Sequence, residues 1–364
     1  MSNNTKIIMH KLDDKKRITR LDRSGIASSI ESLGLQFRQA WDEATKIVIP
    51  KSYRKIDTIL INGMGGSALG GHIIEALYGE KLSVPIKVIN SYVLPGFVDS
   101  RTLYIISSYS GTTEEPVSTF HAARKRRAKI LLIGAGGTIA HYAKHYRVPA
   151  YIFKPQFNPS NQPRMGLGYS IAGQLAMLKR DGLLKVGNNE MKKVIDNVVG
   201  LHRKFGIKVP FRKNEAKKIA QKLYGKIPII IGAGHLTQNA HVLANQINEN
   251  SKVFSMYFVV PELNHHLMEG MRFPVTNKKQ LHFLCIESSK YLKKVQKRFV
   301  ITKKVLSKNS IHHSTYTATG ATKLHQVFEL LVFGSYMNFY MSMLYGIDPA
   351  PIPYVDYFKK QLAQ

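Results

Sequence analysis

The stretch Thr58-Ile-Leu-Ile-Asn-Gly-Met-Gly-Gly-Ser-Ala-Leu-Gly-Gly71 joins a short apolar run to a glycine-rich loop. An apolar segment with helical composition, residues 73–78, follows the loop directly. A buried strand, a glycine loop and a helix in this order are typical of a βαβ unit in a parallel sheet. The N–H groups at the start of such a helix face the carboxyl edge of the sheet and favour an anion there. The stretch therefore predicts an α/β fold with an anion site at its first loop.

The same pattern continues along the chain and then starts again. Short β-rich runs, most of them separated by segments of helical length, occupy residues 86–89, 103–106, 130–133 and 150–153. A second strand, 227–231, ends in Gly232-Ala-Gly234 and precedes a helical run, 241–248. Further strands are expected at 253–258, 281–286 and 311–317. The repetition of strand, glycine loop and helix predicts two copies of one architecture.

We expect three parts. Residues 1–50 have apolar positions at helical spacing and form an N-terminal helical arm. The first domain, 51–185, holds the expected phosphate-binding loops, and the second, 186–364, ends in two helices near 320–346 and 352–362. Each domain is expected to be a parallel sheet flanked by helices.

The charge is the most unusual property of the composition. The 364 residues carry 53 Lys and Arg against 23 Asp and Glu, a formal net charge of +30. Such a charge attracts polyanions, but no zinc knuckle or aromatic-basic strand accompanies it. The densest cluster, 124–129, lies where a helix is expected to end, and cations there suit the helix dipole. We therefore expect a solvated basic surface and no specific nucleic-acid partner.

Two features bear on location and on redox chemistry. The apolar run 328–347 is interrupted by polar residues such as Glu329 and Asn338, which indicates a buried helix and no membrane partner. The polar, basic residues 1–16 are not typical of a secretory signal, so a cytoplasmic protein is expected. The single cysteine, Cys285, excludes an internal disulfide and is expected in the core.

The first glycine loop has a rival interpretation as a dinucleotide-binding loop. Two features argue against it, because the loop supplies a hydroxyl, Ser67, and the segment 90–95 has no acidic residue for a ribose. A Walker loop is excluded, since no Gly-Lys-Ser/Thr follows the glycines.

A second loop, Ser107-Ser-Tyr-Ser-Gly-Thr-Thr-Glu-Glu115, follows the strand at 103–106 and opens another helix. Hydroxyls and N–H groups at a helix start can bind phosphate without a lysine. Ordinary N-capping by Ser110, with Glu114 or Glu115 in the first turn, is the alternative. Capping needs one hydroxyl, whereas the loop supplies Ser107, Ser108, Ser110 and Thr113, so phosphate binding is favoured.

Both loops resemble those of the sugar-isomerase (SIS) domain, and their details resemble the bifunctional phosphoglucose/phosphomannose isomerase family. Further matches to family motifs follow in order at 162–169, 246–252, 261–270, 348–352 and 357–362. The resemblance runs from about residue 25 to the end of the chain.

The resemblance implies an isomerase that converts glucose 6-phosphate, mannose 6-phosphate or both to fructose 6-phosphate through an enediolate. It implies that Glu249 is the base, that Arg164 stabilises the enediolate, and that His265 of the neighbouring subunit opens the sugar ring, assisted by Lys359. The adjacent His266 and Lys360 are the alternatives to these last two.

It also implies a homodimer with shared sites and no cofactor. The phosphate-binding residues implied by the resemblance are Gly65, Gly66, Ser67, Ser108, Ser110 and Thr113. No metal site is expected, because the only adjacent histidine pairs cannot easily ligate one ion together. A non-catalytic sugar-phosphate sensor of the same fold is the alternative function.

Overall fold

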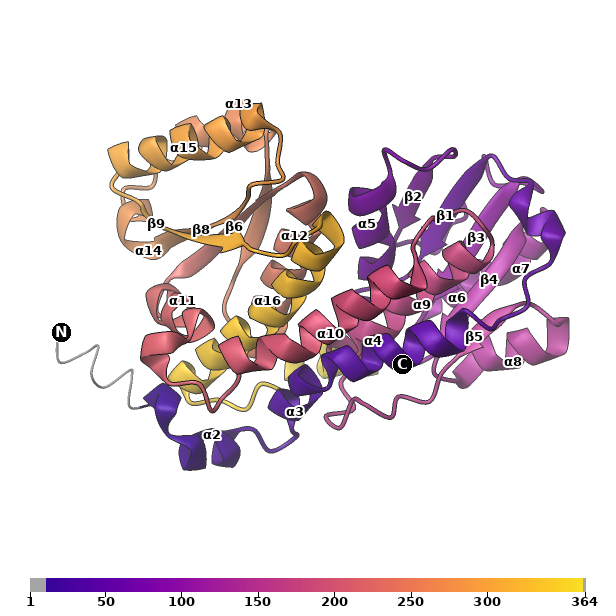
Figure 1. Cartoon of the computed structure of the whole chain (residues 1–364), viewed down its shortest axis with the longest axis horizontal. Coiled ribbons are helices and arrows are strands. Elements are labelled where there is room, and N and C mark those ends of the chain that lie inside the picture. The colour runs from indigo at the N-terminus through magenta and orange to yellow at the C-terminus, as the bar shows by residue number, and fades with distance from the viewer. Residues whose placement is uncertain (1–10, 363–364) are drawn as a thin grey trace.

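The computed structural model describes residues 11–362, so residues 1–10 of the expected arm lie outside the described part. It contains two parallel sheets, each with helices on its faces (Figure 1). The first sheet has the order β2-β1-β3-β4-β5 and the second the order β7-β6-β8-β9. The strands are β1 Thr58–Asn62, β2 Ile86–Ile89, β3 Thr102–Ser107, β4 Lys129–Gly134, β5 Ala150–Ile152, β6 Ile227–Ala233, β7 Met256–Val260, β8 Leu281–Ser288 and β9 His312–Ala318. The predicted α/β fold with two parallel sheets is confirmed.

Helices connect these strands and flank both sheets. They are α2 Lys15–Leu21, α3 Ile26–Glu31, α4 Leu33–Ala44, α5 Gly66–Tyr78, α6 Glu114–Ser118, α7 Phe120–Lys125, α8 Gly137–Tyr146, α9 Leu167–Arg180, α10 Asn188–Phe205, α11 Glu215–Leu223, α12 Thr237–Gln246, α13 Leu263–Gly270, α14 Asn277–Gln280, α15 Lys293–Lys308, α16 Lys323–Tyr345 and α17 Pro353–Leu362. The two expected C-terminal helices correspond to α16 and α17.

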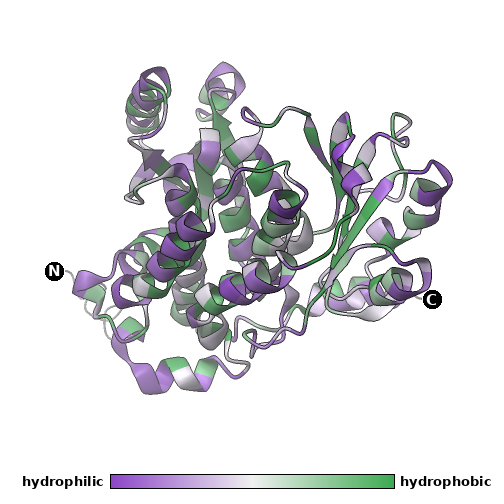
Figure 2. Ribbon diagram, turned by 45° about the vertical axis from the view of Figure 1, so that its right-hand side comes forward, coloured by the Kyte–Doolittle hydropathy of each residue, from purple (hydrophilic) through white to green (hydrophobic). Residues whose placement is uncertain are grey.

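The first sheet is covered on both faces, as a parallel sheet requires. Side chains of β1 alternate between the faces, so that Ile59 and Ile61 join the core under α5 and α9 while Leu60 joins the one under α7 and α8. All three are fully buried. Figure 2 shows this distribution, with hydrophobic strands inside and hydrophilic helix surfaces outside. The continuous apolar runs of the strands follow from this double burial.

The described part of the expected N-terminal arm is helical, as predicted. It forms the separate helices α2, α3 and α4, and α4 packs along α9 with Phe37 and Trp41 in the main core. This segment is therefore part of the packed fold. The division of the chain at residues 50 and 185 stays a prediction.

Helix α16 lies in the middle of the molecule, between α10, α11 and α12 (Figure 1). It is long and apolar enough to cross a membrane by length and composition, but the apolar window is entirely buried inside the described chain. The expectation of a buried helix is therefore confirmed.

Several expected strand ends differ from the structure by one or two residues, and the largest difference is at the start of β7. The strand expected at 253–258 begins at Met256, where it pairs with Ile229 of β6. The side chain of Asn248 binds both backbone groups of Ser255, which directs these two groups away from pairing with β6. A side chain seven residues away thus delays the strand, and the local apolar pattern does not show this.

Candidate active site

Both predicted phosphate loops lie at the carboxyl edge of the first sheet, one after β1 and one after β3. Gly65 has φ +48°, ψ −129°, a conformation that L side chains rarely adopt, so a glycine is required where the loop enters α5. Among the described residues, the N–H groups of Gly65 and Gly66 donate to no acceptor. These two groups are free to bind an anion.

The second loop is organised around the Ser108 hydroxyl. Its Oγ accepts hydrogen bonds from the N–H of Gly111 at 3.1 Å and of Thr113 at 3.3 Å, and lies 2.7 Å from Thr113 Oγ1. Ser110 is exposed, and its Oγ accepts from the N–H of Thr112 at 3.3 Å. Helix α6 begins after Thr113, which makes no side-chain cap bond, so the capping alternative for Ser110 is wrong. Ser108 and Thr113 thus shape the loop, and Ser110 offers an exposed hydroxyl.

The two loops contact each other and the turn η2, Pro163–Met165. The N–H of Tyr109 donates to Ser67 Oγ at 2.9 Å. A Cβ on Gly66 would lie 3.7 Å from the Cα of Arg164, and a Cβ on Gly166 would overlap the Tyr109 ring at 2.2 Å. The close packing brings the backbone of Arg164 beside the first phosphate loop.

The Arg164 side chain is buried and reaches the second half of the chain. Its Nε donates to Asn250 Oδ1 at 2.7 Å, and its Nη1 donates to Gln162 Oε1 at 2.8 Å. Its Nη2 donates to the carbonyl oxygens of Pro349 at 3.0 Å and Ala350 at 2.6 Å. These bonds use four of the five guanidinium N–H groups. Arg164 therefore joins η2, the Asn250 turn and the segment before α17.

Glu249 stands on the π-helical turn η5, Ile247–Ser251, which continues α12. Its Oε2 lies 3.8 Å from Arg164 Nε, and 37% of its side chain is exposed. Burial raises the pKa of the Glu249 carboxyl, against the charges of Arg164, Lys252 and Lys359, which lower it. A carboxyl with a raised pKa beside a fixed cation is suited to accept and return a proton.

Buried amides hold the turn that carries Glu249. Asn250 Nδ2 donates to Asn338 Oδ1 at 2.9 Å, and Asn338 Nδ2 donates to Gln246 Oε1 at 3.0 Å. Gln246 Nε2 donates in turn to Ser335 Oγ at 3.1 Å. Together with the Arg164–Asn250 bond, this chain of hydrogen bonds, which we call the amide relay, connects α16 to Arg164. Asn338, one of the polar residues that interrupt the apolar run of α16, is thus a hydrogen-bond partner of this turn.

Lys252 is a neighbour of Glu249 that sequence reasoning did not single out. Its Nζ donates to the carbonyl oxygens of Glu249 at 2.7 Å and Pro349 at 2.8 Å. Burial, with the charge of Arg164 beside it, lowers its pKa to about 8. In the sequence, Lys252 resembled the many surface lysines, and only its place three residues after Glu249 pointed to this role.

The remaining predicted residues are exposed. Lys359 lies on α17 with no buried neighbour on that helix, although its charge still lowers the pKa of Glu249. His265 is exposed on α13, which packs on α15 and β7. Among the described residues, no hydrogen bond or ion pair joins His265 to Glu249, whose charged partner is Arg164. Figure 1 shows α13 beside α15 on the second domain. His266 is also exposed, and its Nε2 is 4.0 Å from Glu262 Oε1.

Neither a metal nor a reactive thiol is suggested by the described part of the chain. Within residues 11–362 there is no group of three or more His, Cys, Asp or Glu side chains placed to hold a metal ion. Cys285 is buried in β8, and burial raises the pKa of its thiol to about 12, so the expected core role is confirmed.

The fold and the loops define a protein built from sugar-isomerase domains. A crystal structure of a glucose-6-phosphate isomerase from Chlamydia trachomatis has a TM-score of 0.72 at 13% identity, covering 99% of this chain and 85% of that one. At this identity the likeness shows the fold alone. A family model described as the bacterial phospho-glucose isomerase C-terminal SIS domain matches residues 212–362.

Sequence relatives narrow the class to one family. A bifunctional phosphoglucose/phosphomannose isomerase of Caldicellulosiruptor bescii is 32% identical over 338 residues, which cover 92% of this chain and 98% of the relative. One of the same name from Thermoplasma volcanium is 30% identical over 339 residues, covering 92% and 99%. The chain belongs to the bifunctional phosphoglucose/phosphomannose isomerase family and is an isomerase.

Proposed function

We propose that the chain interconverts glucose 6-phosphate and mannose 6-phosphate with fructose 6-phosphate through an enediolate. The relatives named above carry both activities in their names. In this proposal Glu249 moves a proton between C1 and C2 of the sugar, and the free Nη1 hydrogen of Arg164 faces the developing oxyanion. The proton leaves one carbon and returns to the next, so the reaction needs no cofactor.

The observation that carries the proposal is that Arg164 links the first phosphate loop to the Glu249 turn. Gly66 lies against the backbone of Arg164, whose Nε is 3.8 Å from Glu249. A phosphate bound by Gly65, Gly66, Ser67 and the hydroxyls of the second loop (Ser108, Ser110 and Thr113) would therefore sit beside a cation and a carboxyl of raised pKa. Such an arrangement fixes one end of a phosphosugar and places a base at the other.

The test is a coupled assay that starts from fructose 6-phosphate and follows both aldose products. Glu249→Gln should lower turnover about 10²–10⁴-fold or more, because the amide cannot accept the proton. Glu80→Gln removes an exposed carboxylate just after α5 and should leave turnover unchanged. An active Glu249→Gln variant refutes the mechanism. Phosphosugar binding without turnover in the unaltered protein would favour a sugar-phosphate sensor.

We further propose that the working unit is a cytoplasmic homodimer whose sites are shared. Two observations support this: α17 exposes large apolar side chains, with Tyr354 88% and Phe358 61% accessible, and no hydrogen bond or ion pair joins His265 to Glu249 within the described chain. In a two-fold dimer both helices could be covered and His265 could reach the partner's site. Lys359 would then assist it in opening the sugar ring.

Mixing two inactive variants tests the shared site. Glu249→Gln and His265→Ala each lack one of the two required groups. After denaturation and refolding together in equal amounts, about half of the dimers pair one of each, and one site in such a dimer is complete. Activity should return to about a quarter of the unaltered level. No recovery, with dimers present, would show that each site is built from one chain.

A further inference from the structure

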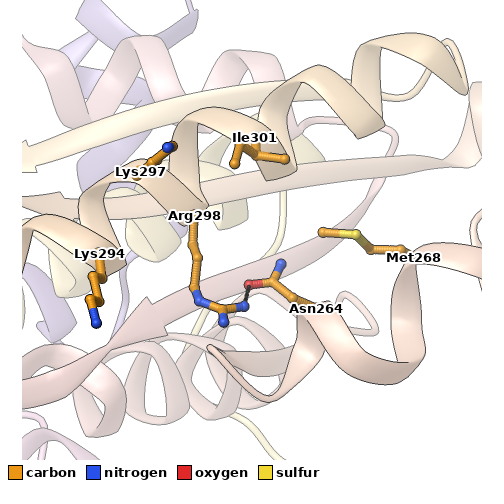
Figure 3. A pocket seen from close by; sticks show the side chains of 6 residues that line it. All are labelled: Asn264, Met268, Lys294, Lys297, Arg298 and Ile301. Atoms are coloured by element: carbon orange, nitrogen blue, oxygen red, sulfur yellow. Dashed lines mark hydrogen bonds between the residues drawn. The ribbon is translucent and has the colours of Figure 1, made fainter.

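We propose that the pocket between α13 and α15 binds a small organic anion that carries a phosphate or pyrophosphate group. Figure 3 shows this pocket, which has a volume of about 440 Å³. Its lining consists of Asn264, Met268, Lys294, Lys297, Arg298 and Ile301. It shares no residue with the phosphate loops or the Glu249 turn, so the proposal goes beyond the proposed function and does not rest on it.

The charge of the pocket is uncompensated. Lys294, Lys297 and Arg298 take part in no ion pair among the residues that the structure describes. They stand in the first half of α15, which has no acidic residue in its first turn. Cations at this end of a helix oppose its dipole, which costs stability. An anion in the pocket removes both the mutual repulsion of these cations and the conflict with the dipole.

One of the three cations, Arg298, is held in place by hydrogen bonds. Arg298 Nη1 donates to Asn264 Oδ1 at 3.3 Å, and Asn264 Nδ2 donates to Thr302 Oγ1 at 2.8 Å. Thr302 is fully buried and donates to the Arg298 carbonyl at 2.8 Å. Figure 3 shows Arg298 extending across the pocket from α15 toward Asn264 on α13. The Arg298 guanidinium group retains N–H groups for a second acceptor. Because the group is planar, two of its N–H groups can bind two phosphate oxygens at once.

The apolar lining indicates what the anion carries. Met268 of α13 and Ile301 of α15 form an apolar wall, with Met268 pointing back toward Arg298 (Figure 3). An inorganic ion would leave this wall in contact with water. Small-molecule sites combine such apolar walls with a few polar groups in volumes of about 300–1,000 Å³. The pocket therefore fits a phosphorylated metabolite of nucleotide or sugar size.

Isothermal titration calorimetry with adenosine 5′-diphosphate and with inorganic pyrophosphate tests the site. At about 150 mM salt, where surface charges are screened beyond about 8 Å, we expect ADP to bind with a Kd below about 1 mM. Lys294→Gln/Lys297→Gln should weaken binding at least about tenfold. Lys304→Gln/Lys308→Gln removes the same charge from α15 outside the pocket and should leave the Kd within about twofold.

Four outcomes would overturn the proposal. Absence of ADP binding at about 10 mM means that the pocket is not such a site. Equal weakening by the two double variants means that binding follows net charge alone. Loss of ADP binding in saturating fructose 6-phosphate assigns the ligand to the substrate site. Pyrophosphate binding as tight as that of ADP means that the apolar wall contributes nothing.

Discussion

The amide relay makes a quantitative prediction at Asn338, which is fully buried on α16. Asn338→Leu keeps the number and branching of the side-chain heavy atoms but removes the acceptor of Asn250 Nδ2 on α16 and the donor to Gln246 Oε1. Each buried polar group left unpaired costs about 1–3 kcal/mol, so unfolding should become easier by about 2–6 kcal/mol. A chain of this size has about 5–15 kcal/mol of stability, so the variant should still fold.

The same change should affect catalysis. Without Asn338, the Asn250 amide is free to turn, and Arg164 loses the acceptor that orients its Nε toward Glu249. A displacement of about 1 Å in a reacting group can lower turnover about 10²-fold. Because the Arg164 charge lowers the pKa of Glu249, its withdrawal should raise that pKa further. The acid limb of kcat/KM should therefore move to higher pH.

The control is Asn239→Leu, on α12. Asn239 is also buried against α16, where its Nδ2 donates to the Val327 carbonyl at 2.9 Å and its Oδ1 has no partner among the described residues. Loss of the hydrogen bond from Asn239 should lower the free energy of unfolding by about 1 kcal/mol and leave the pH profile of kcat/KM unchanged. Thermal unfolding and the coupled assay measure both effects. The reasoning is refuted if Asn338→Leu is destabilised as calculated yet keeps full kcat and an unshifted profile, or if Asn239→Leu loses turnover equally.

Three further predictions concern positions outside the relay. Gly111→Ala should lower the free energy of unfolding by about 3 kcal/mol or more, the cost of a severe clash. The reason is that Gly111 has φ +76° and the new Cβ would lie 1.8 Å from the Gly136 carbonyl oxygen. A calorimetric melting temperature equal to that of the unaltered protein would disprove this. Burial raises the pKa of Asp181 to about 6 from an ordinary 3.8, so the native state binds the extra proton and stability falls as pH rises between these values. Asp181→Asn should therefore be more stable than the unaltered protein at pH 7.5 by up to about 3 kcal/mol, a gain that should vanish below about pH 4; urea unfolding at both pH values measures it. Cys285 should resist thiol reagents until the protein unfolds, because its thiol is buried and its pKa is about 12; rapid labelling of the native protein would contradict this.

Local features of the sequence determined the secondary structure and the place of the phosphate loops. Runs of buried β-branched and leucine residues form strands because both faces of a parallel sheet are covered, and the glycines after β1 allow the chain to turn into α5. The strand beginning at Met256 and the packed position of α4 were not predictable in this way. Both depend on contacts between residues distant in the sequence, such as the packing of the Phe37 ring against Phe328 of α16, with 4.3 Å between the ring centroids.

The candidate site shows the same division. The sequence by itself determined which residue types stand after each strand, and its motifs singled out Glu249 and Arg164. Only the tertiary structure decided that these two lie 3.8 Å apart and that Asn338, from α16, orients them through Asn250. It also decided the raised pKa of Glu249 and the lowered pKa of Lys252. The physical reason is that desolvation and hydrogen bonding depend on which groups the fold brings together, and residues 164, 250 and 338 meet only after the whole chain has packed.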